Sequence, residues 1–488
     1  MKSDAREAVE QYLTTARWFG GKGRDLTLVD VRRAGLLEPA SGAGPTVGVE
    51  LVTVEYAGGE RETYQMPLAY YADEQDRLGH ALVGAWDDDD LGKVHAYDAV
   101  HDRFATALYL EAFDKGRTVS SGDARLVFHR LPGHDLDLDT HSTLFSGEQS
   151  NSSVAFGEDS LMKVFRKVTH GRNPDVVIHE ALTARESEHV ASLYGWLELV
   201  ESGSDEPIQL AMLQQFLRTA SDGWEIALAS VRDLFAEADL HADEVGGDFA
   251  SEAERLGLAT AQVHDALAQA FPTVTWSRDE LTAVARAMLS RLDAAVEVVP
   301  QLREHADALR TTYTALADLA AGGASAVAQR VHGDYHLGQT LRTVKGWKIV
   351  DFEGEPAKPL AQRVEPDLVW RDVAGMLRSF DYAAHAVEAD VQADPEAEQQ
   401  IAFRAAEWAE RNTAAFLRGY IDNSDRTSAG TLSDEQWLAL RAYIADKAVY
   451  EAVYEARNRP TWLSIPLGAI ARLTQPEPSP DPKESSDR

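Results

Sequence analysis

The sequence predicts an α+β protein whose first part is rich in strands and whose second part is mainly helical. Residues 26–70 alternate apolar and polar side chains in β-branched segments, a pattern typical of an antiparallel sheet. Residues 144–168 contain short apolar segments separated by polar turns, which predict a β-meander. From residue 224 onwards apolar residues recur at helical spacing almost to the end. A chain of 488 residues is also too long for one hydrophobic core, so we expect several domains.

Charge and composition restrict the class of protein. The 80 acidic residues exceed the 47 basic ones and give a formal charge of −33, which argues against nucleic acid and anionic membranes as partners. Because the chain has no cysteine, it cannot form disulfides or thiolate metal sites. The first residues lack the basic and apolar blocks of a signal peptide, and no run approaches the ~18 apolar residues of a membrane span. We therefore expect a cytoplasmic protein.

The first elements predict a small module. Residues 4–15 have apolar side chains at helical spacing, and the glycine-spaced basic segment 16–24 follows them. This segment could hold a phosphate, but it neither follows a strand nor opens a helix, as a nucleotide-binding glycine loop does. A structural turn is therefore the preferred interpretation. With the strands of residues 26–70, these elements predict a separate β-rich module that ends near residue 95.

The turn of the 144–168 meander predicts contact with phosphates. Ser150, Asn151 and Ser152 provide small side chains and backbone N–H groups, which close approach to phosphate oxygens requires. The third strand carries Lys163 among apolar residues, where a buried ammonium needs a partner such as a phosphate oxygen. The alternative is a lysine that reaches solvent from an edge strand.

The stretch VHGDYHLGQTLRTVKGWKIVDFEGEP at residues 331–356 has the outline of a phosphoryl-transfer site. Asp334 can accept the proton of an attacking hydroxyl, and Gln339 and Asp351 offer oxygen atoms suited to Mg²⁺. Strands at 340–342 and 347–350 would return Asp351 to the side of Asp334. Protein kinases show a similar spacing, with a base aspartate, an amide five residues later and a metal-binding aspartate in a later D-F-G segment.

Two further expectations follow from the similarity to protein kinases. In those enzymes a glutamate of the helix after the lysine strand pairs with that lysine. Here the helix over residues 175–194 offers glutamates at 180, 186 and 188, and Glu180 is preferred while the others stay open. The apolar strand at residues 208–217 breaks at Gln214, Gln215 and Phe216, which is the place for a hinge whose backbone reads adenine.

Several blocks of the sequence resemble the actinobacterial maltokinases, which belong with the aminoglycoside-phosphotransferase-like kinases and lie near the glucosamine kinases. The blocks span nearly the whole chain, at residues 18–23, 148–154, 173–175, 332–339, 351–356, 371–380 and 454–462. The resemblance implies a bilobal, protein-kinase-like fold with an N-terminal β-rich cap domain and a large helical C-lobe. The expected division is a cap at 1–95, an intermediate subdomain and N-lobe at 96–213, the C-lobe at 214–474 and a disordered tail at 475–488.

The resemblance also implies an activity. Such proteins transfer the γ-phosphoryl group of ATP to the anomeric hydroxyl of maltose for α-glucan synthesis, often in association with trehalose synthase. Asp334 would then be the base, Gln339 and Asp351 the Mg²⁺ ligands and Lys163 the phosphate anchor, with adenine at residues 214–216. Val177 stands where the family pattern often has glutamate, so the partner of Lys163 stays open.

A candidate sugar site lies on a C-lobe helix. Lys447, Glu451, Tyr454 and Asn458 share one side of the helix over residues 439–457, and Trp462 follows it. Polar ends that bind hydroxyls and an aromatic face that stacks on a sugar ring suit a polyhydroxy ligand. A solvated stripe is the alternative.

Other candidates and alternatives complete the prediction. His332, Glu353 and Arg371 are further candidates for substrate binding, although Arg371 and Asp372 could instead orient the catalytic loop through hydrogen bonds. A zinc site at His332 and His336 lacks a third ligand at a defined spacing. A kinase of glucosamine, or of another small sugar, is the main alternative function. A catalytically silent binding protein is disfavoured because Asp334, Asp351 and Lys163 are all present.

Overall fold

We describe a computed structural model of the 488-residue chain. The structure describes residues 2–475, except residues 41, 146–149, 237–247, 320–325, 356–357, 391–394, 426 and 428–429. The predicted disordered tail, the turn residues 146–149 and most of the acidic segment after residue 236 therefore lie outside the described residues. The contacts divide the chain into two compact units, residues 1–186 with 191–218 and residues 187–190 with 219–488, which are described separately.

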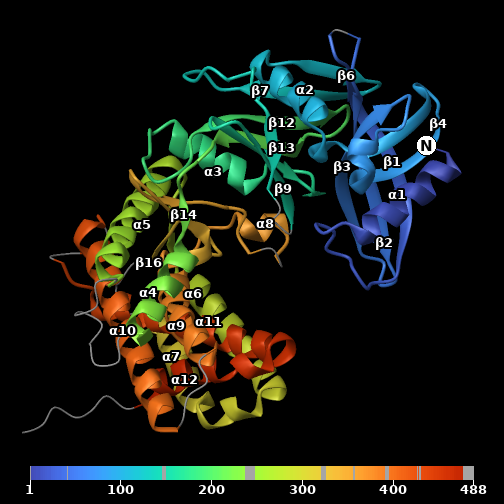
Figure 1. The fold of residues 1–488 in the computed structure, drawn as a ribbon. Helices are drawn as coiled ribbons and strands as arrows, with labels where there is room; N and C mark the ends of the chain where they lie inside the picture. The colour runs from blue at the N-terminus through green and yellow to red at the C-terminus, as the bar shows by residue number, and fades with distance from the viewer. Residues whose placement is uncertain are drawn as a thin grey trace, which may run out of the picture. The chain divides into compact units, whose positions relative to one another are not determined.

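The first unit begins with a helix packed on an antiparallel sheet, drawn in blue in Figure 1. The sheet order is β1-β2-β3-β5-β4, and the short strand β11 also pairs with β3. The apolar face of the helix, Ala5, Val9 and Leu13, is buried against the sheet with Trp18 and Phe19. Segment 16–24 thus forms turns that bury two aromatic residues, as the structural interpretation predicted. The elements are α1 Ser3–Thr15, β1 Leu26–Leu37, β2 Thr46–Tyr56, β3 Arg61–Tyr71, β4 Leu82–Asp88, β5 Gly92–Asp98 and β11 Lys167–Val168.

A second antiparallel sheet of the first unit has the order β6-β7-β12-β13-β10-β9-β8. Its apolar residues share one core with the helix α2 and with residues of β1 and β2. The contacts group both sheets in one compact unit. The division of this unit into a cap at 1–95 and an N-lobe at 96–213 stays a prediction. The elements are α2 Arg103–Asp114, β6 Thr118–Ser121, β7 Ala124–Arg130, β8 Ser142–Leu144, β9 Asn151–Phe156, β10 Ser160–Phe165, α3 Pro174–Thr183, β12 Leu193–Glu201 and β13 Ile208–Gln215.

The second unit is mainly helical, as the spacing of apolar residues predicted (Figure 1). Its long helices α5 and α10 approach backbone to backbone, because Gly257 and Gly419 lie where any Cβ atom would fall about 2 Å from a carbonyl oxygen of the facing helix. The main elements are β14 Ser221–Asp222, α4 Gly223–Ala236, α5 Ala250–Ala270, β15 Val274–Trp276, α6 Arg278–Val298, α7 Ala306–Asp318, β16 Ala326–Ala328, β17 Thr340–Thr343, β18 Gly346–Ile349, α8 Leu360–Arg363, α9 Trp370–Asp390, α10 Pro395–Asn423, α11 Asp434–Asn458 and α12 Ser464–Thr474.

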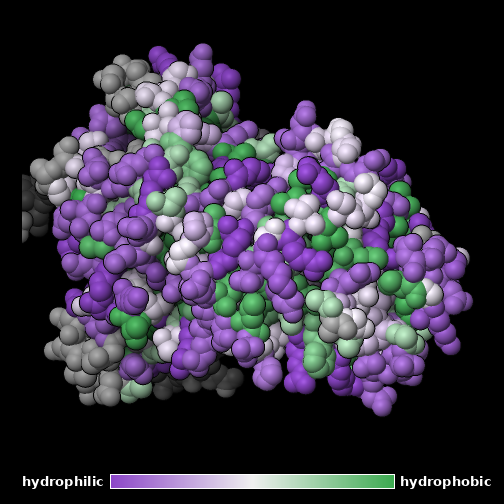
Figure 2. Space-filling model, turned by 90° about the horizontal axis from the view of Figure 1, so that it is seen from above, coloured by the Kyte–Doolittle hydropathy of each residue, from purple (hydrophilic) through white to green (hydrophobic). Residues whose placement is uncertain are grey.

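The surface of the protein is mainly hydrophilic, as the large number of charged residues leads us to expect. Hydrophilic residues cover most of the face shown in Figure 2, and hydrophobic residues form small patches between them. In the part of the chain that the structure describes, no helix is both long and apolar enough to cross a lipid bilayer.

Candidate active site

The stretch with the phosphoryl-transfer pattern folds as a loop followed by a β-hairpin. Strands β17 and β18 pair from Thr340 and Ile349 to Thr343 and Gly346, so the predicted hairpin is confirmed. Immediately after the hairpin, the N–H of Val350 donates to the carbonyl oxygen of Gln339 at 3.0 Å. This bond holds the chain just before Asp351 beside the end of the loop at residues 331–339. That loop is called the catalytic loop below because it carries Asp334, the expected base.

A buried aspartate at the start of α9 holds the catalytic loop. Asp372 is 1% exposed and accepts hydrogen bonds from the backbone N–H groups of His332 at 2.7 Å and Gly333 at 2.8 Å. These residues immediately precede Asp334. The hypothesis that Asp372 orients the catalytic loop therefore agrees with its contacts.

The same carboxylate is supported from α5. His264 lies with Nε2 3.1 Å from Asp372 and with Nδ1 3.0 Å from the hydroxyl of Tyr420 on α10. Burial opposes ionisation of Asp372, but the hydrogen bond from His264 and the donors of the loop outweigh it and hold the pKa below its usual range. His264 and Tyr420 had no motif in the sequence, since their meeting depends on the close packing of α5 and α10.

Asp334, the expected base, is partly exposed on this loop. Its side chain is 27% exposed, and Oδ1 lies 3.9 Å from the ammonium nitrogen of Lys447 on α11. His332 lies two residues earlier, is buried, and has Nε2 2.9 Å from the carbonyl oxygen of Val350. Its Nδ1 accepts the N–H of Asp334 at 3.4 Å. Both ring nitrogens are therefore engaged by backbone groups, and substrate binding by His332 stays a prediction.

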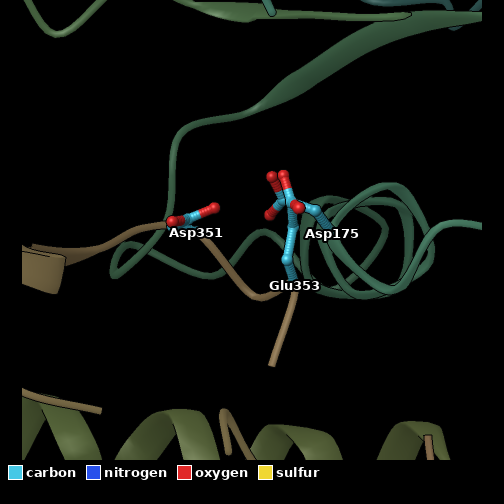
Figure 3. Close-up of side chains that lie close together, drawn as sticks. All are labelled: Asp175, Asp351 and Glu353. Carbon is cyan, nitrogen blue, oxygen red and sulfur yellow. The ribbon is translucent and has the colours of Figure 1, made fainter. Parts of the chain in front are cut away.

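Asp351 and Glu353 provide carboxylates on the loop after β18, and Figure 3 shows them converging there. One oxygen of each lies within 4.8 Å of the other. Asp351 has a φ of +66°, a left-handed conformation that few residues other than glycine adopt without strain. The amide nitrogen of Gln339 lies 3.3 Å from an oxygen of Asp351. This set of oxygen donors, with the predicted pair Gln339 and Asp351 in contact, fits a hard cation such as Mg²⁺.

Lys163 lies on β10, an interior strand, so the edge-strand alternative is wrong. Its Nζ lies 2.9 Å from Oδ2 of Asp175 in the first turn of α3. Glu180, the predicted partner, instead forms an exposed pair with Arg172 and is a wrong assignment. Asn173 caps α3 by accepting the N–H of Asp175 at 2.8 Å, which places that carboxylate in the first turn.

The buried pair of Lys163 and Asp175 is electrostatically satisfied. Burial opposes the charge of Asp175, but Lys163 and His179 outweigh it and hold the pKa well below its usual range. His179 Nδ1 lies 3.1 Å from Oδ1 of the same carboxylate. The capping signal of Asn173 followed by proline could have located Asp175 from the sequence, because it fixes where α3 begins.

The register between β9 and β10 determines which predicted phosphate-binding residues lie on the same face of the sheet as Lys163. Ser153 pairs with Lys163 and Ser152 pairs with Val164, so Ser152 lies on the opposite face of the sheet from Lys163. Its hydroxyl accepts a hydrogen bond from Arg166. The side chain of Ser152 therefore points away from the face of Lys163, while Asn151 shares that face and Ser150 is exposed before the strand. Phosphate contact through the backbone N–H groups of these residues stays a prediction.

The predicted adenine hinge lies at the end of β13. The N–H of Gln215 donates to Ser192 at 2.8 Å, and the N–H of Phe216 donates to Asp159 at 3.0 Å. These two N–H groups are therefore engaged within the first unit. The adenine role of residues 214–216 stays a prediction that would use other backbone groups.

Several predicted sugar-binding residues already have partners within the second unit. Glu451 is 9% exposed and pairs with the buried Arg378 at 2.8 Å. Burial opposes the charge of Arg378, but Glu451 and Asp381 outweigh it and raise its pKa. Arg371 pairs with Glu355 and with Asp367, each at 3.1 Å. Arg371 therefore already has carboxylate partners outside the loop at residues 331–339, and its roles in substrate binding or in orienting that loop stay predictions.

Aromatic groups at the end of α11 remain accessible. Tyr454 is 45% exposed, and the side chain of Asn458 donates to its carbonyl oxygen at 2.8 Å. The guanidinium of Arg459 lies 4.4 Å from the ring centroid of Trp462 and 5.5 Å from that of Tyr454. The predicted aromatic face therefore exists, with Arg459 covering part of it.

Comparison with known proteins adds two family matches. Residues 12–102 match the maltokinase N-terminal cap domain, and residues 245–412 match the phosphotransferase enzyme family. The chain is 31% identical over 330 residues to a glucosamine kinase of Streptacidiphilus jiangxiensis, covering 65% of this chain and 70% of that protein. It is 27% identical over 332 residues to a glucosamine kinase of Mycolicibacterium smegmatis, covering 67% and 78%.

A solved structure shows the same fold. A glucosamine kinase in complex with glucosamine, ADP and inorganic phosphate aligns with a TM-score of 0.68 at 23% identity, over 97% of this chain and 100% of that one. A second crystal form of a glucosamine kinase aligns with the same score over 91% and 94%. The predicted kinase-like fold with a β-rich cap and a helical C-terminal part is therefore confirmed.

Proposed function

Because this chain belongs to the phosphotransferase family of ATP-dependent sugar kinases that carry a maltokinase-type cap domain, we propose that its acceptor is maltose. The proposed reaction transfers the γ-phosphoryl group of ATP to the anomeric hydroxyl and yields maltose 1-phosphate and ADP. Mg²⁺ dependence is part of the proposal, with Gln339 and Asp351 as ligands that would neutralise phosphate charge.

The observation that supports a neutral sugar is that three carboxylates of the second unit, those of Asp334, Glu355 and Glu451, each have a cationic partner. Lys447 lies 3.9 Å from Asp334, and Arg371 lies 3.1 Å from Glu355. One helical turn after Lys447, Glu451 is paired with Arg378 at 2.8 Å. An uncharged acceptor such as maltose leaves these pairs undisturbed.

The charges around Asp334 would not favour binding of an amino sugar. Its ammonium group would be attracted by Asp334 but repelled by Lys447, so the two interactions offset each other. At a separation of about 5 Å, each interaction is about 1–3 kcal/mol for an effective dielectric constant of about 80 to 20. Without Lys447, the attraction to Asp334 would remain and would favour glucosamine.

The roles of the residues follow from their surroundings. Asp334 would orient the acceptor hydroxyl and accept its proton, from a loop whose backbone Asp372 fixes. Lys163 would contact the phosphates, held in place by Asp175. Tyr450 lies among the charges of the acceptor side, since burial first and then Glu355 and Asp334 raise its pKa. It offers a phenol and a ring face to a sugar.

Glucosamine is the second candidate, because both relatives above are glucosamine kinases. A buried carboxylate ready to meet an ammonium would favour it. Glu451 is buried and pairs with Arg378 at 2.8 Å, but burial outweighs the effect of Arg378 and keeps the pKa of Glu451 above its usual value. The comparison with relatives therefore supports the reaction class, while the charge pairing supports maltose.

One substitution separates the two candidates. Lys447→Gln removes the cation beside Asp334 and keeps a side chain of similar length. We expect a lower kcat/KM for maltose and a gain for glucosamine of about 5- to 100-fold, from the electrostatic interaction above. Lys345→Gln, in the exposed β17–β18 turn, is the matched control. It should change the kcat/KM for neither maltose nor glucosamine.

Product analysis completes the test. NMR of the wild-type product should show phosphorus coupled to C1 of the reducing-end glucose. Phosphorus on another carbon would contradict the anomeric hydroxyl as the acceptor. A glucosamine kcat/KM that does not change in Lys447→Gln would contradict the role given to the paired charges.

The wider role is also part of the proposal. Maltose 1-phosphate would serve α-glucan and glycogen biosynthesis in the cytoplasm, and an association with trehalose synthase would supply maltose beside the enzyme. Co-purification of the full-length chain with trehalose synthase tests the association, and separate elution at physiological salt would contradict it.

A further inference from the structure

One stretch of chain, residues 160–168, joins the two sheets of the first unit. Strand β10 carries Lys163, and after Arg166 the chain continues as β11, which pairs with β3 of the cap at Lys167 and Tyr64. Gln65 of β3 also donates to the carbonyl oxygens of Phe165 at 2.9 Å and Leu210 at 2.8 Å. The cap is therefore bonded directly to the strand that carries the nucleotide lysine.

Arg166 lies at the junction of the two sheets and is 1% exposed. Its Nη2 donates to both carboxylate oxygens of Asp98, at 3.0 and 2.9 Å, and its Nε donates to the hydroxyl of Ser152 at 2.8 Å. The ring centroid of Trp18 lies 4.5 Å from its Cζ atom. A single side chain thus connects β9 to the end of β5 and to the turn after α1.

Asp98 also accepts hydrogen bonds from other residues of the cap. The hydroxyl of Tyr12 on α1 donates to its Oδ2 at 3.1 Å, and the N–H of Val100 lies 3.4 Å from its Oδ1. Burial first, and then the charge of Asp98, raise the pKa of Tyr12, so Tyr12 stays a donor. Helix α1, the turn with Trp18 and strand β5 therefore all converge on one guanidinium.

We propose that Arg166 is a positioning residue for ATP, through which the cap sets the place of strand β9. Ser152 and Ser153 are consecutive and point to opposite faces, and Ser153 pairs with Lys163. A displacement of Ser152 on the cap side therefore displaces Ser153 on the side of Lys163. The buried ion pair supports this placement, because Nη2 of Arg166 donates to both carboxylate oxygens of Asp98 in a charge-assisted contact.

A purely structural role is the alternative, and the chain offers a control for it. Arg33 is a second cap arginine, paired with Glu50 at 2.7 Å and Asp88 at 2.8 Å, and it makes no contact with β9 among the described residues. If Arg166 acted only in folding, Arg33→Lys and Arg166→Lys would both lower stability, and neither would change the use of ATP. The proposal predicts that only Arg166→Lys changes ATP use.

The test begins with the milder change Ser152→Ala, which removes the acceptor of Arg166 and leaves the ion pair with Asp98. We expect a Kd for a non-hydrolysable ATP analogue with Mg²⁺, measured by calorimetry without sugar, about tenfold above wild type, from the loss of one hydrogen bond to a charged donor. The KM for ATP should rise by a similar factor while kcat changes by less than twofold.

Ser142→Ala is the matched control for this variant. Ser142 lies on β8 in the same sheet and its hydroxyl is 2.7 Å from that of Thr106, with no link to the cap strands among the residues described. It should lower the melting temperature by a comparable amount and leave the Kd of the ATP analogue within twofold. Equal effects of the two serine variants on ATP would overturn the proposal.

A double-mutant cycle extends the test to the cap. Tyr12→Phe removes only the hydroxyl that contacts Asp98. It should raise the Kd of the ATP analogue about twofold to fivefold, because one part-buried hydrogen bond to the Asp98 carboxylate is lost while Arg166 keeps its ion pair. Because both changes act through Arg166, their effects in Tyr12→Phe/Ser152→Ala should not multiply. Effects that multiply as for independent sites would contradict the coupling.

This inference depends on ATP use, which family membership establishes, and not on the identity of the sugar. Its readout is nucleotide binding without an acceptor. Failure of the maltose proposal would leave these results unchanged, and an unchanged ATP Kd in a folded Ser152→Ala variant would overturn the inference alone.

Discussion

Replacing Asp372 with asparagine tests how the catalytic loop is held. The wild-type carboxylate accepts the N–H groups of His332 and Gly333 at 2.7 and 2.8 Å and contacts His264 at 3.1 Å. Asparagine has nearly the same shape but only one acceptor oxygen. Its amide group must therefore present hydrogens to a second N–H or to His264, where the wild type has a negative charge.

The magnitude follows from these contacts. A hydrogen bond from an N–H to a buried charged acceptor contributes about 1.5–3 kcal/mol. In the variant one such bond is lost and the asparagine NH₂ group faces another hydrogen-bond donor, so we expect a total cost of about 2–4 kcal/mol. If the cost falls on the placement of Asp334, kcat drops about 30- to 1,000-fold, at about 1.36 kcal/mol for each factor of ten. Nucleotide binding should not change, because Asp372 acts through the loop of the base.

The assay compares kcat from coupled ADP release with the Kd of an ATP analogue from calorimetry. Asp102→Asn is the matched control, since Asp102 is fully buried and also accepts a backbone N–H, that of Phe104 at 3.1 Å. It should lower stability and preserve kcat. A folded Asp372→Asn enzyme with kcat within twofold of wild type would refute the role of Asp372 in the catalytic loop.

Other substitutions test the base and the lysine pair. Asp334→Asn should abolish turnover while the Kd of an ATP analogue stays near normal, and near-normal turnover would remove Asp334 from the base role. Lys163→Met should weaken ATP use and cost about 3–5 kcal/mol of unfolding free energy by leaving the Asp175 carboxylate without its lysine, and an unchanged urea midpoint would contradict the buried pair. Asp175→Asn should be destabilised similarly, whereas Glu180→Gln, which only loses the exposed pair with Arg172, should stay within about 1 kcal/mol of wild type. Because the folded pKa of Asp175 lies below its unfolded value, its contribution is fully present above about pH 4 and is lost as the pH falls through the folded pKa. The stability gap between wild type and Asp175→Asn should thus be constant from about pH 5 to pH 8 and narrow in acid, and a gap that widens in acid would contradict the sign of the shift.

The local pattern of the catalytic stretch was sufficient to predict its structure. Strands β17 and β18, the turn between them and the meeting of Gln339 with Asp351 all depend on residues close in sequence. Short-range spacing and turn chemistry determine such hairpins, so the sequence predicts them well. The assignment of Asp372 to loop orientation also needed only the position of the helix start.

Where the structure differs from the prediction, strand register, the start of a helix and the packing of that helix decide the contacts. The pairing of Lys163 with Asp175 instead of Glu180 depends on where α3 begins and how it packs on β10. The side chain of Ser152 lies opposite Lys163 because a shift of one residue in strand register exchanges the two faces, and sequence alone does not fix register. The ion pair of Arg166 with Asp98 and the approach of Lys447 to Asp334 join segments 68 and more than 100 residues apart, which no spacing rule predicts.

The most direct test of the account is the sugar preference of the wild-type enzyme. An ADP-release assay with ATP and Mg²⁺ would compare kcat/KM for maltose, glucose, glucosamine, trehalose and an aminoglycoside, and we expect maltose to give the highest value. A higher kcat/KM for glucosamine than for maltose would keep the kinase fold and chemistry but contradict the inference that paired charges around Asp334 select a neutral sugar.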